Sequence, residues 1–166
     1  MTTRKHAFAA VVDARTRVVV LGSLPGDRSL AAGQYYAHRQ NQFWALIGAA
    51  IGHDLARLDY PQRLDALLEA RVGLWDVIAA ATRSGSSDAA IRDHQARDLG
   101  AWAADLPSLR ALAFNGGTAW TIGTRALGDS LSGVARVALP SSSPLHTVGV
   151  AAKLPAWLAL RAFLRD

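Results

Sequence analysis

The sequence predicts an α/β fold in which helices cover both faces of a short, mainly parallel sheet of four strands. Four short apolar runs have the length and composition of buried strands. The stretches between them carry apolar residues at helical spacing. Strands that alternate with helices form parallel sheets, because each connection crosses a face of the sheet. With 166 residues and no internal repeat or long linker, the chain is predicted to form one domain, residues 1–166.

The four predicted strands are Val18 to Leu21, Leu74 to Ile78, Leu109 to Phe114 and Val134 to Leu139. The predicted helices follow from apolar residues three or four positions apart. One begins near Phe43, a second surrounds Leu64 to Leu68, and a third runs from Leu99 to Leu106. Thr118 is expected to cap a fourth helix, and Pro155 suits the first turn of a C-terminal helix.

The composition is that of a globular protein, with 51% apolar and 19% charged residues. No apolar stretch is long enough to span a membrane, and the N-terminus lacks a convincing signal peptide, so we expect a cytoplasmic protein. There are no cysteines, and the five histidines lack the spacing of a metal-binding helix. We therefore expect no metal and no cofactor. The net charge of +5 comes mostly from arginine and suits a nucleic-acid partner, but solvated surface arginines explain it equally well.

The carboxyl ends of parallel strands meet at one edge of a sheet, and functional loops gather there. The predicted loops are polar and rich in glycine and serine: Gly22 to Ser29, Ala79 to Ser87, Asn115 to Gly117, and Pro140 to Thr147. The first of them, GSLPGDRS, has only two glycines and no lysine, so it fits neither familiar phosphate-binding fingerprint. This edge of the sheet is nevertheless predicted to hold the functional site.

The segment QYYAHRQNQFWALIG, residues 34–48, places aromatic and polar side chains directly before a helix. The rings of Tyr35 and Tyr36 offer flat faces for a nucleobase, or they simply pack with their hydroxyls in water. Phe43 and Trp44 begin the apolar face of the helix, which favours the core. Asn41 stands where a side chain caps the helix, so a cap and a catalytic group are both open.

The segment LPSSSPLHT, residues 139–147, follows the last predicted strand. Serine hydroxyls and backbone N–H groups in a turn stiffened by proline can hold a phosphate. An ordinary polar turn has the same composition, so this loop carries little weight alone.

Five segments resemble the uracil-DNA glycosylase superfamily in their sequence and in their order along the chain. They are GSLPG, QYYAHRQNQFW, GLWDVIAAATRSGSSDAAI, AFNGG and LPSSSP. Within this superfamily, the chain is most similar to the hypoxanthine-DNA (deoxyinosine) glycosylases. The resemblance implies a three-layer α/β/α sandwich. It also implies a monofunctional, monomeric enzyme that flips a deaminated base from DNA and hydrolyses its N-glycosidic bond without a metal. Two alternatives are a mismatch-specific uracil-DNA glycosylase and a non-catalytic damaged-DNA-binding domain of the same fold.

The resemblance also implies site residues. Asn41 is expected to position the attacking water, and Ser23 stands where many relatives hold a polar group beside the scissile bond. The implied base-binding residues are Gly22, Leu24, Pro25, Gly26, Tyr36, Phe43 and Asn115. The implied phosphate-binding residues are Ser141, Ser142, Ser143, Pro144 and His146. Arg39-Gln40 and Leu145-His146 depart from the family pattern, which leaves the range of bases and the role of His146 open.

Overall fold

A computed structural model describes residues 3–83, 86–146 and 148–166. Its centre is a parallel sheet in the strand order β3-β2-β6-β7. The strands are β2 (Val18–Gly22), β3 (Val72–Asp76), β6 (Ala111–Asn115) and β7 (Ala135–Leu139). Every residue of β2 and β6 is buried, which explains why both read as continuous apolar runs. The predicted four-stranded parallel sheet is confirmed.

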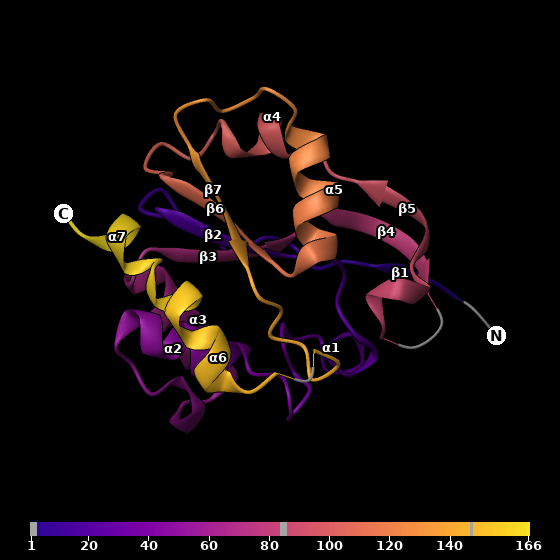
Figure 1. The fold of residues 1–166 in the computed structure, drawn as a ribbon, viewed down its shortest axis with the longest axis horizontal. Coiled ribbons are helices and arrows are strands. Elements are labelled where there is room, and N and C mark those ends of the chain that lie inside the picture. The colour runs from indigo at the N-terminus through magenta and orange to yellow at the C-terminus, as the bar shows by residue number, and fades with distance from the viewer. Residues whose placement is uncertain (1–2, 84–85, 147) are drawn as a thin grey trace.

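Helices cover both faces of this sheet, so the predicted three layers are confirmed (Figure 1). One face carries α4 (Leu99–Ala103) and α5 (Gly117–Leu127). The other carries α2 (Phe43–Ile51), α3 (Tyr60–Glu69) and α6 (Val150–Leu158). Two short helices, α1 (Asp27–Ala32) and α7 (Arg161–Leu164), and two 3-10 turns, η1 (Leu55–Arg57) and η2 (Asp88–Ala90), complete the helical elements of the described residues.

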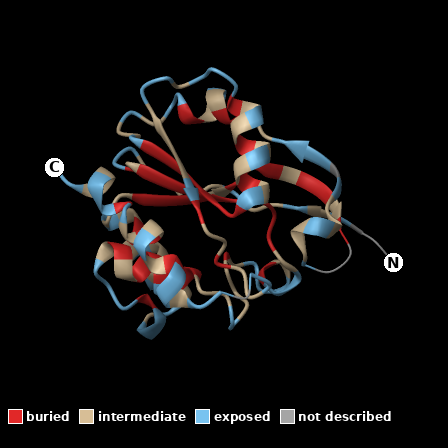
Figure 2. Ribbon diagram, in the orientation of Figure 1, coloured by how far each residue is buried: buried red, intermediate tan, exposed pale blue. Residues whose placement is uncertain are grey.

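The alternation of side chains along β2 divides the core into two clusters. Val18 and Val20 pack with α2, α3 and α6, whereas Val19 and Leu21 pack with α4 and α5. Figure 2 shows the resulting band of buried strands between helices that are buried on one side and exposed on the other. The sheet is therefore a rigid base for the loops at its carboxyl edge.

A second sheet, antiparallel and in the order β1-β4-β5, corrects the sequence prediction. Its strands are β1 (Thr3–His6), β4 (Ile78–Arg83) and β5 (Arg92–Ala96). The predicted strand from Leu74 to Ile78 is two strands, and the predicted loop from Ala79 to Ser87 begins as β4. The chain turns at Val77, whose N–H donates to the Gly22 carbonyl at the end of β2 (2.8 Å). The outer strands β1 and β5 are polar, so no apolar pattern marks them.

Two helix ends also differ from the prediction. Gly116, with φ of 98°, caps α5, and Thr118 lies inside the helix. Pro155 lies within α6 and not in its first turn. Three residues of the predicted loops, Ser84, Gly85 and Thr147, lie outside the described residues. No helix in the described ranges is both long and apolar enough to cross a membrane.

Candidate active site: a cavity at the carboxyl edge of the parallel sheet

A cavity of about 540 Å³ opens at the carboxyl edge of the parallel sheet. Its floor is formed by Gly22, Asp76 and Asn115, the buried last residues of β2, β3 and β6. Its walls come from three loops and the segment before α2, as the sequence predicts for this edge. The wall residues used below are Ser23 to Ser29, Tyr35, Tyr36, His38, Asn41, Ser86 to Ala89, and Ser141 to His146.

Tyr36 lines this cavity, and Phe43 covers one face of its ring. Its ring stacks on Phe43 with the ring centres 3.9 Å apart and the planes 11° from parallel. Its backbone has φ of 54°, which is a strained conformation for a bulky residue, and its carbonyl accepts a hydrogen bond from Trp44 Nε1 (3.1 Å). Because Phe43 covers one face of the ring, only the opposite face is available to a flat ligand.

The structure corrects the role expected of Phe43. It is fully buried and is not among the cavity-lining residues. It belongs to the core cluster on the α2 side of the sheet and supports Tyr36 from behind. Its contribution to a bound base is therefore indirect.

Asn41 caps a helix and also lines the cavity. Its Oδ1 accepts a hydrogen bond from the N–H of Phe43 (2.9 Å), the first residue of α2, so the carboxamide caps the start of that helix. Asn41 also lines the cavity and is half-buried. The cap fixes the orientation of the amide, while Oδ1 keeps a second lone pair for another donor.

Asn115, the expected base-reading residue, lines the cavity, and its amide is bonded within the protein. Its Oδ1 accepts from the backbone N–H of Ser142 (2.9 Å), and its Nδ2 donates to Ser142 Oγ (2.9 Å) and to the Tyr36 hydroxyl (3.3 Å). A backbone N–H can only donate, so this bond fixes which way the amide points. The hydrogen bonds of the Asn115 amide therefore hold the loop after β7 and the Tyr36 side chain in place.

The same contacts correct the role expected of Ser142. It is buried, and its N–H is already bonded to Asn115, so it does not offer that group to a phosphate. Its carbonyl accepts from the N–H of Gln42 (2.9 Å), the residue before α2. Ser142 thus joins the loop after β7 to the end of β6 and the start of α2.

The rest of the loop after β7 has the form of consecutive turns. Ser141 Oγ accepts from the N–H of Ser143 (3.1 Å), and Ser143 Oγ accepts from the N–H of Leu145 (3.1 Å). Each hydroxyl therefore keeps its own hydrogen for a further acceptor. Pro144 and the exposed His146 complete this wall of the cavity.

Helix α6 fixes both ends of this loop. Trp157 Nε1 donates to the Pro140 carbonyl (3.1 Å), and Lys153 Nζ donates to the His146 carbonyl (3.2 Å). Lys153 is 1% exposed, and burial lowers the pKa of its ammonium from the usual value. A buried ammonium group thus lies at the end of the loop that carries these serines.

The GSLPG turn is closed by the segment that precedes β5. Ser23 Oγ donates to Asp88 Oδ1 (2.6 Å), and the N–H of Asp27 donates to Ser86 Oγ (2.9 Å). The buried Arg83 donates to the Pro25 carbonyl and lies 3.6 Å from Asp88 Oδ1. Leu24 packs into the core under the turn, and Gly26 lines the cavity. These contacts bring Ser86 to Ala89 over one side of the cavity.

Asp76 is a cavity residue that the sequence analysis missed. It is 3% exposed, and its Oδ2 has no hydrogen-bond partner among the described residues. Burial raises the pKa of this carboxyl to about 7, with Asp88 adding to the increase and Arg97 and Arg83 opposing it. One signal was available, since a charged residue in the middle of the apolar run from Leu74 to Ile78 is out of place unless the strand ends there.

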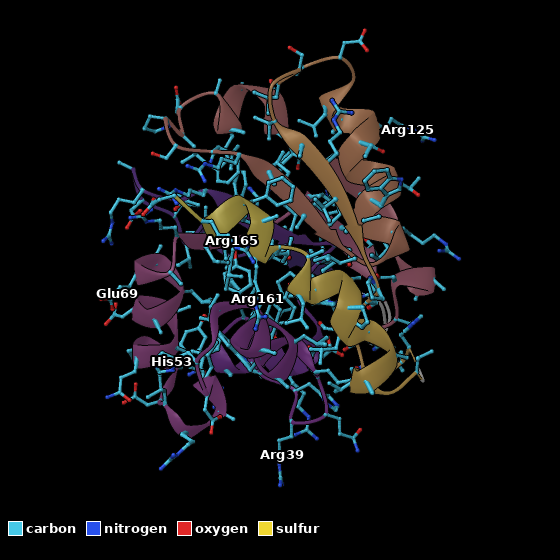
Figure 3. The ribbon with its side chains drawn as sticks, turned by 60° about the vertical axis from the view of Figure 1, so that its left-hand side comes forward. Arg39, His53, Glu69, Arg125, Arg161 and Arg165 are labelled. Carbon is cyan, nitrogen blue, oxygen red and sulfur yellow. The ribbon has the colours of Figure 1, made fainter. Side chains whose placement is uncertain are left out.

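The arginines explain less of the function than the net charge suggests. Several hold backbone carbonyls within the protein, as Arg161 does at the end of α2 and Arg110 does near the C-terminus. Others reach solvent, as Arg39 does from the segment before α2 (Figure 3). The exposed Arg28 lines the cavity. In the described part of the chain, no group of three or more His, Asp or Glu side chains could hold a metal ion.

Known proteins share this fold and sequence. A family model described as the uracil DNA glycosylase superfamily matches residues 9–161. Two curated proteins named hypoxanthine DNA glycosylase, from Methanosarcina barkeri and Methanosarcina acetivorans, are 42% and 43% identical over 113 and 112 residues. These matches cover 68% of this chain and 72% and 71% of the two relatives.

A solved structure agrees with these matches. It is a solution NMR structure from Methanosarcina acetivorans, provisionally named a uracil DNA glycosylase, with a TM-score of 0.86 and 36% identity. The match covers 99% of this chain and 100% of that one. The fold and the cavity are therefore those of a DNA glycosylase, a hydrolase of N-glycosidic bonds. The chain belongs to the uracil DNA glycosylase superfamily.

Proposed function

We propose that this protein removes hypoxanthine from DNA by rotating the damaged nucleotide into the cavity and hydrolysing its N-glycosidic bond with a positioned water. The observation that carries the proposal is the aromatic platform of Tyr36 on Phe43, next to Asn41, in a cavity of about 540 Å³. That volume lies within the range of about 300–1,000 Å³ of small-molecule pockets. The relatives named hypoxanthine DNA glycosylase support this choice of base.

The chemistry asks for positioning more than for acid–base strength. The base leaves as the sugar develops positive charge, and water attacks the opposite face of the sugar. Asn41 holds this water by hydrogen bonds, and its cap on α2 keeps the amide still during the attack. Backbone N–H groups of the GSLPG turn are suited to stabilise negative charge that grows on the leaving base.

The cavity mouth fits a DNA substrate. The hydroxyls of Ser141 and Ser143 are suited to the phosphates that flank the extruded nucleotide, and Lys153 lies at the end of the same loop. Leu145 is 62% exposed on the same loop, an uncommon position for a large apolar side chain. Apolar side chains of this kind enter the base stack in proteins that distort DNA. Extrusion costs a few kcal/mol, and less for a mispaired base, which helps to select the lesion.

The direct test is an excision assay. A labelled duplex with one deoxyinosine is treated with the protein and then with hot alkali, and cleavage at that position is expected. Matched duplexes with deoxyuridine, deoxyxanthosine and normal bases define the range. Cleavage of deoxyuridine alone would make the protein a mismatch-type uracil enzyme. Binding to the deoxyinosine duplex without an abasic product would make it a damage-binding domain.

Asn41→Ala tests the role of the amide. We expect deoxyinosine excision to fall by about 100-fold or more, because the water loses its positioning group, while binding to a duplex with an abasic site is kept. Asn41→Ser is the matched control, because serine still caps α2 but has no amide. Single-turnover rates and melting temperatures of both variants separate the two roles. Full activity in Asn41→Ser would leave Asn41 as a helix cap only.

A further inference from the structure

The carboxyl group of Asp76 lies on the cavity floor and has a buried oxygen without a hydrogen-bond partner among the described residues, which is rare in proteins. It is almost completely buried, and its Oδ2 lacks a hydrogen-bond partner in the described structure. A buried acceptor left unpaired costs free energy, so it is usually satisfied by protein or by a ligand. Two other buried side-chain atoms share this state, Gln42 Oε1 and Arg97 Nε, but neither residue lines the cavity. Of the three described residues with such an atom, Asp76 is thus the one that lines the cavity.

Gly22 makes room for this carboxyl. The two residues are register partners at the ends of β2 and β3. A Cβ atom on residue 22 would lie 2.7 Å from Asp76 Oδ1 and 3.2 Å from the Tyr36 hydroxyl. Any side chain at position 22 would therefore displace the carboxyl from its place beside the Tyr36 ring. The glycine that opens the GSLPG turn serves this close approach.

The neighbouring floor residue, Asn115, already has hydrogen-bond partners within the protein. The amide of Asn115 is bonded through Oδ1 to Ser142 and through Nδ2 to Ser142 and Tyr36. A base that accepted a hydrogen bond from Asn115 would have to break contacts that hold two walls of the cavity, because both hydrogens of its amide are used. Asp76 offers an acceptor at the same depth at no such cost.

Deamination changes the hydrogen-bonding edge of a base in a way that an acceptor can read. In adenine, the ring nitrogen N1 is a bare acceptor beside an amino group. In hypoxanthine, N1 carries a hydrogen and stands beside a carbonyl. A carboxylate has acceptors only, so it bonds the N1–H of hypoxanthine and faces the lone pair of adenine N1 with repulsion.

We propose that Asp76 distinguishes hypoxanthine from adenine, the base from which it arises, by accepting a hydrogen bond from N1–H of hypoxanthine at the floor of the cavity. This inference rests on the proposed function and names the atom that is read. The depth of Asp76 supports it, because the base enters the cavity while the sugar stays joined to the DNA at the mouth. Burial disfavours the negative charge that the bond requires, and the nearby Arg97 and Arg83 partly offset this effect.

The experiment measures binding without cleavage. The probes are three duplexes that carry, at one position, 2′-fluoro-deoxyinosine, 2′-fluoro-deoxyadenosine or a tetrahydrofuran abasic analogue. The fluorine opposes the positive charge that develops at C1′, so the glycosidic bonds stay intact. The abasic duplex reports DNA binding and folding without a base. Wild type, Asp76→Ala and Asp76→Asn are compared, with Asp129→Asn, an exposed residue beyond α5, as the matched control.

We expect Asp76→Ala to bind the inosine duplex about 10- to 100-fold more weakly, the size of a hydrogen bond to a charged group, and to bind the abasic duplex normally. Asp76→Asn should keep most of the inosine affinity, because an amide also accepts. Its preference for inosine over adenosine should fall by about tenfold or more, because an amide also donates to adenine N1. Asp129→Asn should match wild type on all three duplexes.

Three outcomes overturn the inference. Equal weakening of the inosine and abasic duplexes in Asp76→Ala means that Asp76 supports the fold. Unchanged inosine binding with slow cleavage of ordinary deoxyinosine means that it acts on the water. An unchanged preference in Asp76→Asn means that its charge is not read. Failure of the proposed function is separate, because it shows as wild-type protein that neither cuts deoxyinosine nor prefers the inosine duplex.

Discussion

Asp76 and Asn115 occupy equivalent places and are in opposite states. They end β3 and β6, the two strands that flank β2, and both lie buried on the cavity floor. Asn115 makes three hydrogen bonds through its amide, whereas Asp76 Oδ2 makes none among the described residues. The side chain of Asn115 therefore stabilises the protein, whereas that of Asp76 keeps an acceptor that we infer a ligand uses.

The difference separates stability from selection within one small cavity. A satisfied buried polar group holds the surrounding structure in place. An unsatisfied one costs stability and persists at sites where a ligand completes it. Asn115 ties the loop after β7 and the Tyr36 ring to the sheet, so the cavity has its shape before DNA arrives. Asp76 lies at the floor of the same cavity, and its Oδ2 is unpaired among the described residues.

Asn115→Leu should have the largest effect and should not depend on the base. It leaves the buried N–H and hydroxyl of Ser142 without partners, at about 1–3 kcal/mol for each group. For a chain of this size, 1 kcal/mol corresponds to about 2–4 °C, so the melting temperature should fall by about 5 °C or more. Affinity for the inosine and abasic duplexes should fall together by about 30-fold. Thermal denaturation and equilibrium binding measure both effects.

Ser142→Ala is the matched variant for this prediction. It removes only the hydroxyl and keeps the N–H bond to Asn115 Oδ1, so the losses should be smaller. The comparison between the two floor residues would break if Asn115→Leu kept its melting temperature and lost only the preference for inosine. Asn115 would then be the reader of the base.

The pH dependence of the preference for inosine over adenosine tests the role of Asp76 in this comparison. With a pKa of about 7, the carboxyl is about nine-tenths ionised at pH 8 and about one-tenth ionised at pH 6. The protonated form donates as well as accepts, so it suits adenine N1 as well as hypoxanthine. The preference for the inosine duplex over the adenosine duplex should therefore narrow by about fivefold to tenfold as the pH falls from 8 to 6.

Several charged groups act on this titration. Arg97 and Arg83 favour the ionised form, and Asp88 opposes it. The hydroxyls of Tyr35 and Tyr36 have raised pKa values and stay neutral over this range. The ratio of two affinities cancels changes that affect both duplexes alike. In Asp76→Asn the ratio should be flat, and a slope that survives in this variant would assign the pH dependence to another group.

The sequence predicts the position of the site in the fold better than the contacts of its side chains. Buried β-branched runs mark the strands of the parallel sheet, so the edge that carries the cavity follows from the pattern alone. The strands β1 and β5 are polar, so this pattern does not predict them. The hydrogen bonds between Asn115 and Ser142 could not be predicted either, because the two residues are 27 positions apart and their bonds form only in the folded chain. Asp76 was missed because the predicted strand ran past it to Ile78.

Substitution of Ser23, the residue that follows β2, should have the smallest effect on activity among these predictions. Ser23 lies between Asp76 and Asn115, and its hydroxyl donates to Asp88, which is partly exposed. A hydrogen bond at such a place contributes about 1 kcal/mol, so Ser23→Ala should lower kcat/KM on deoxyinosine by about threefold to fivefold. In an Asp88→Ala background the same change should add little, because the bond is already gone. A loss of about 100-fold that persists in that background would place the Ser23 hydroxyl in the reaction itself. The central strand would then end in a catalytic group, and the contrast between its two neighbours would describe only the edges of the site.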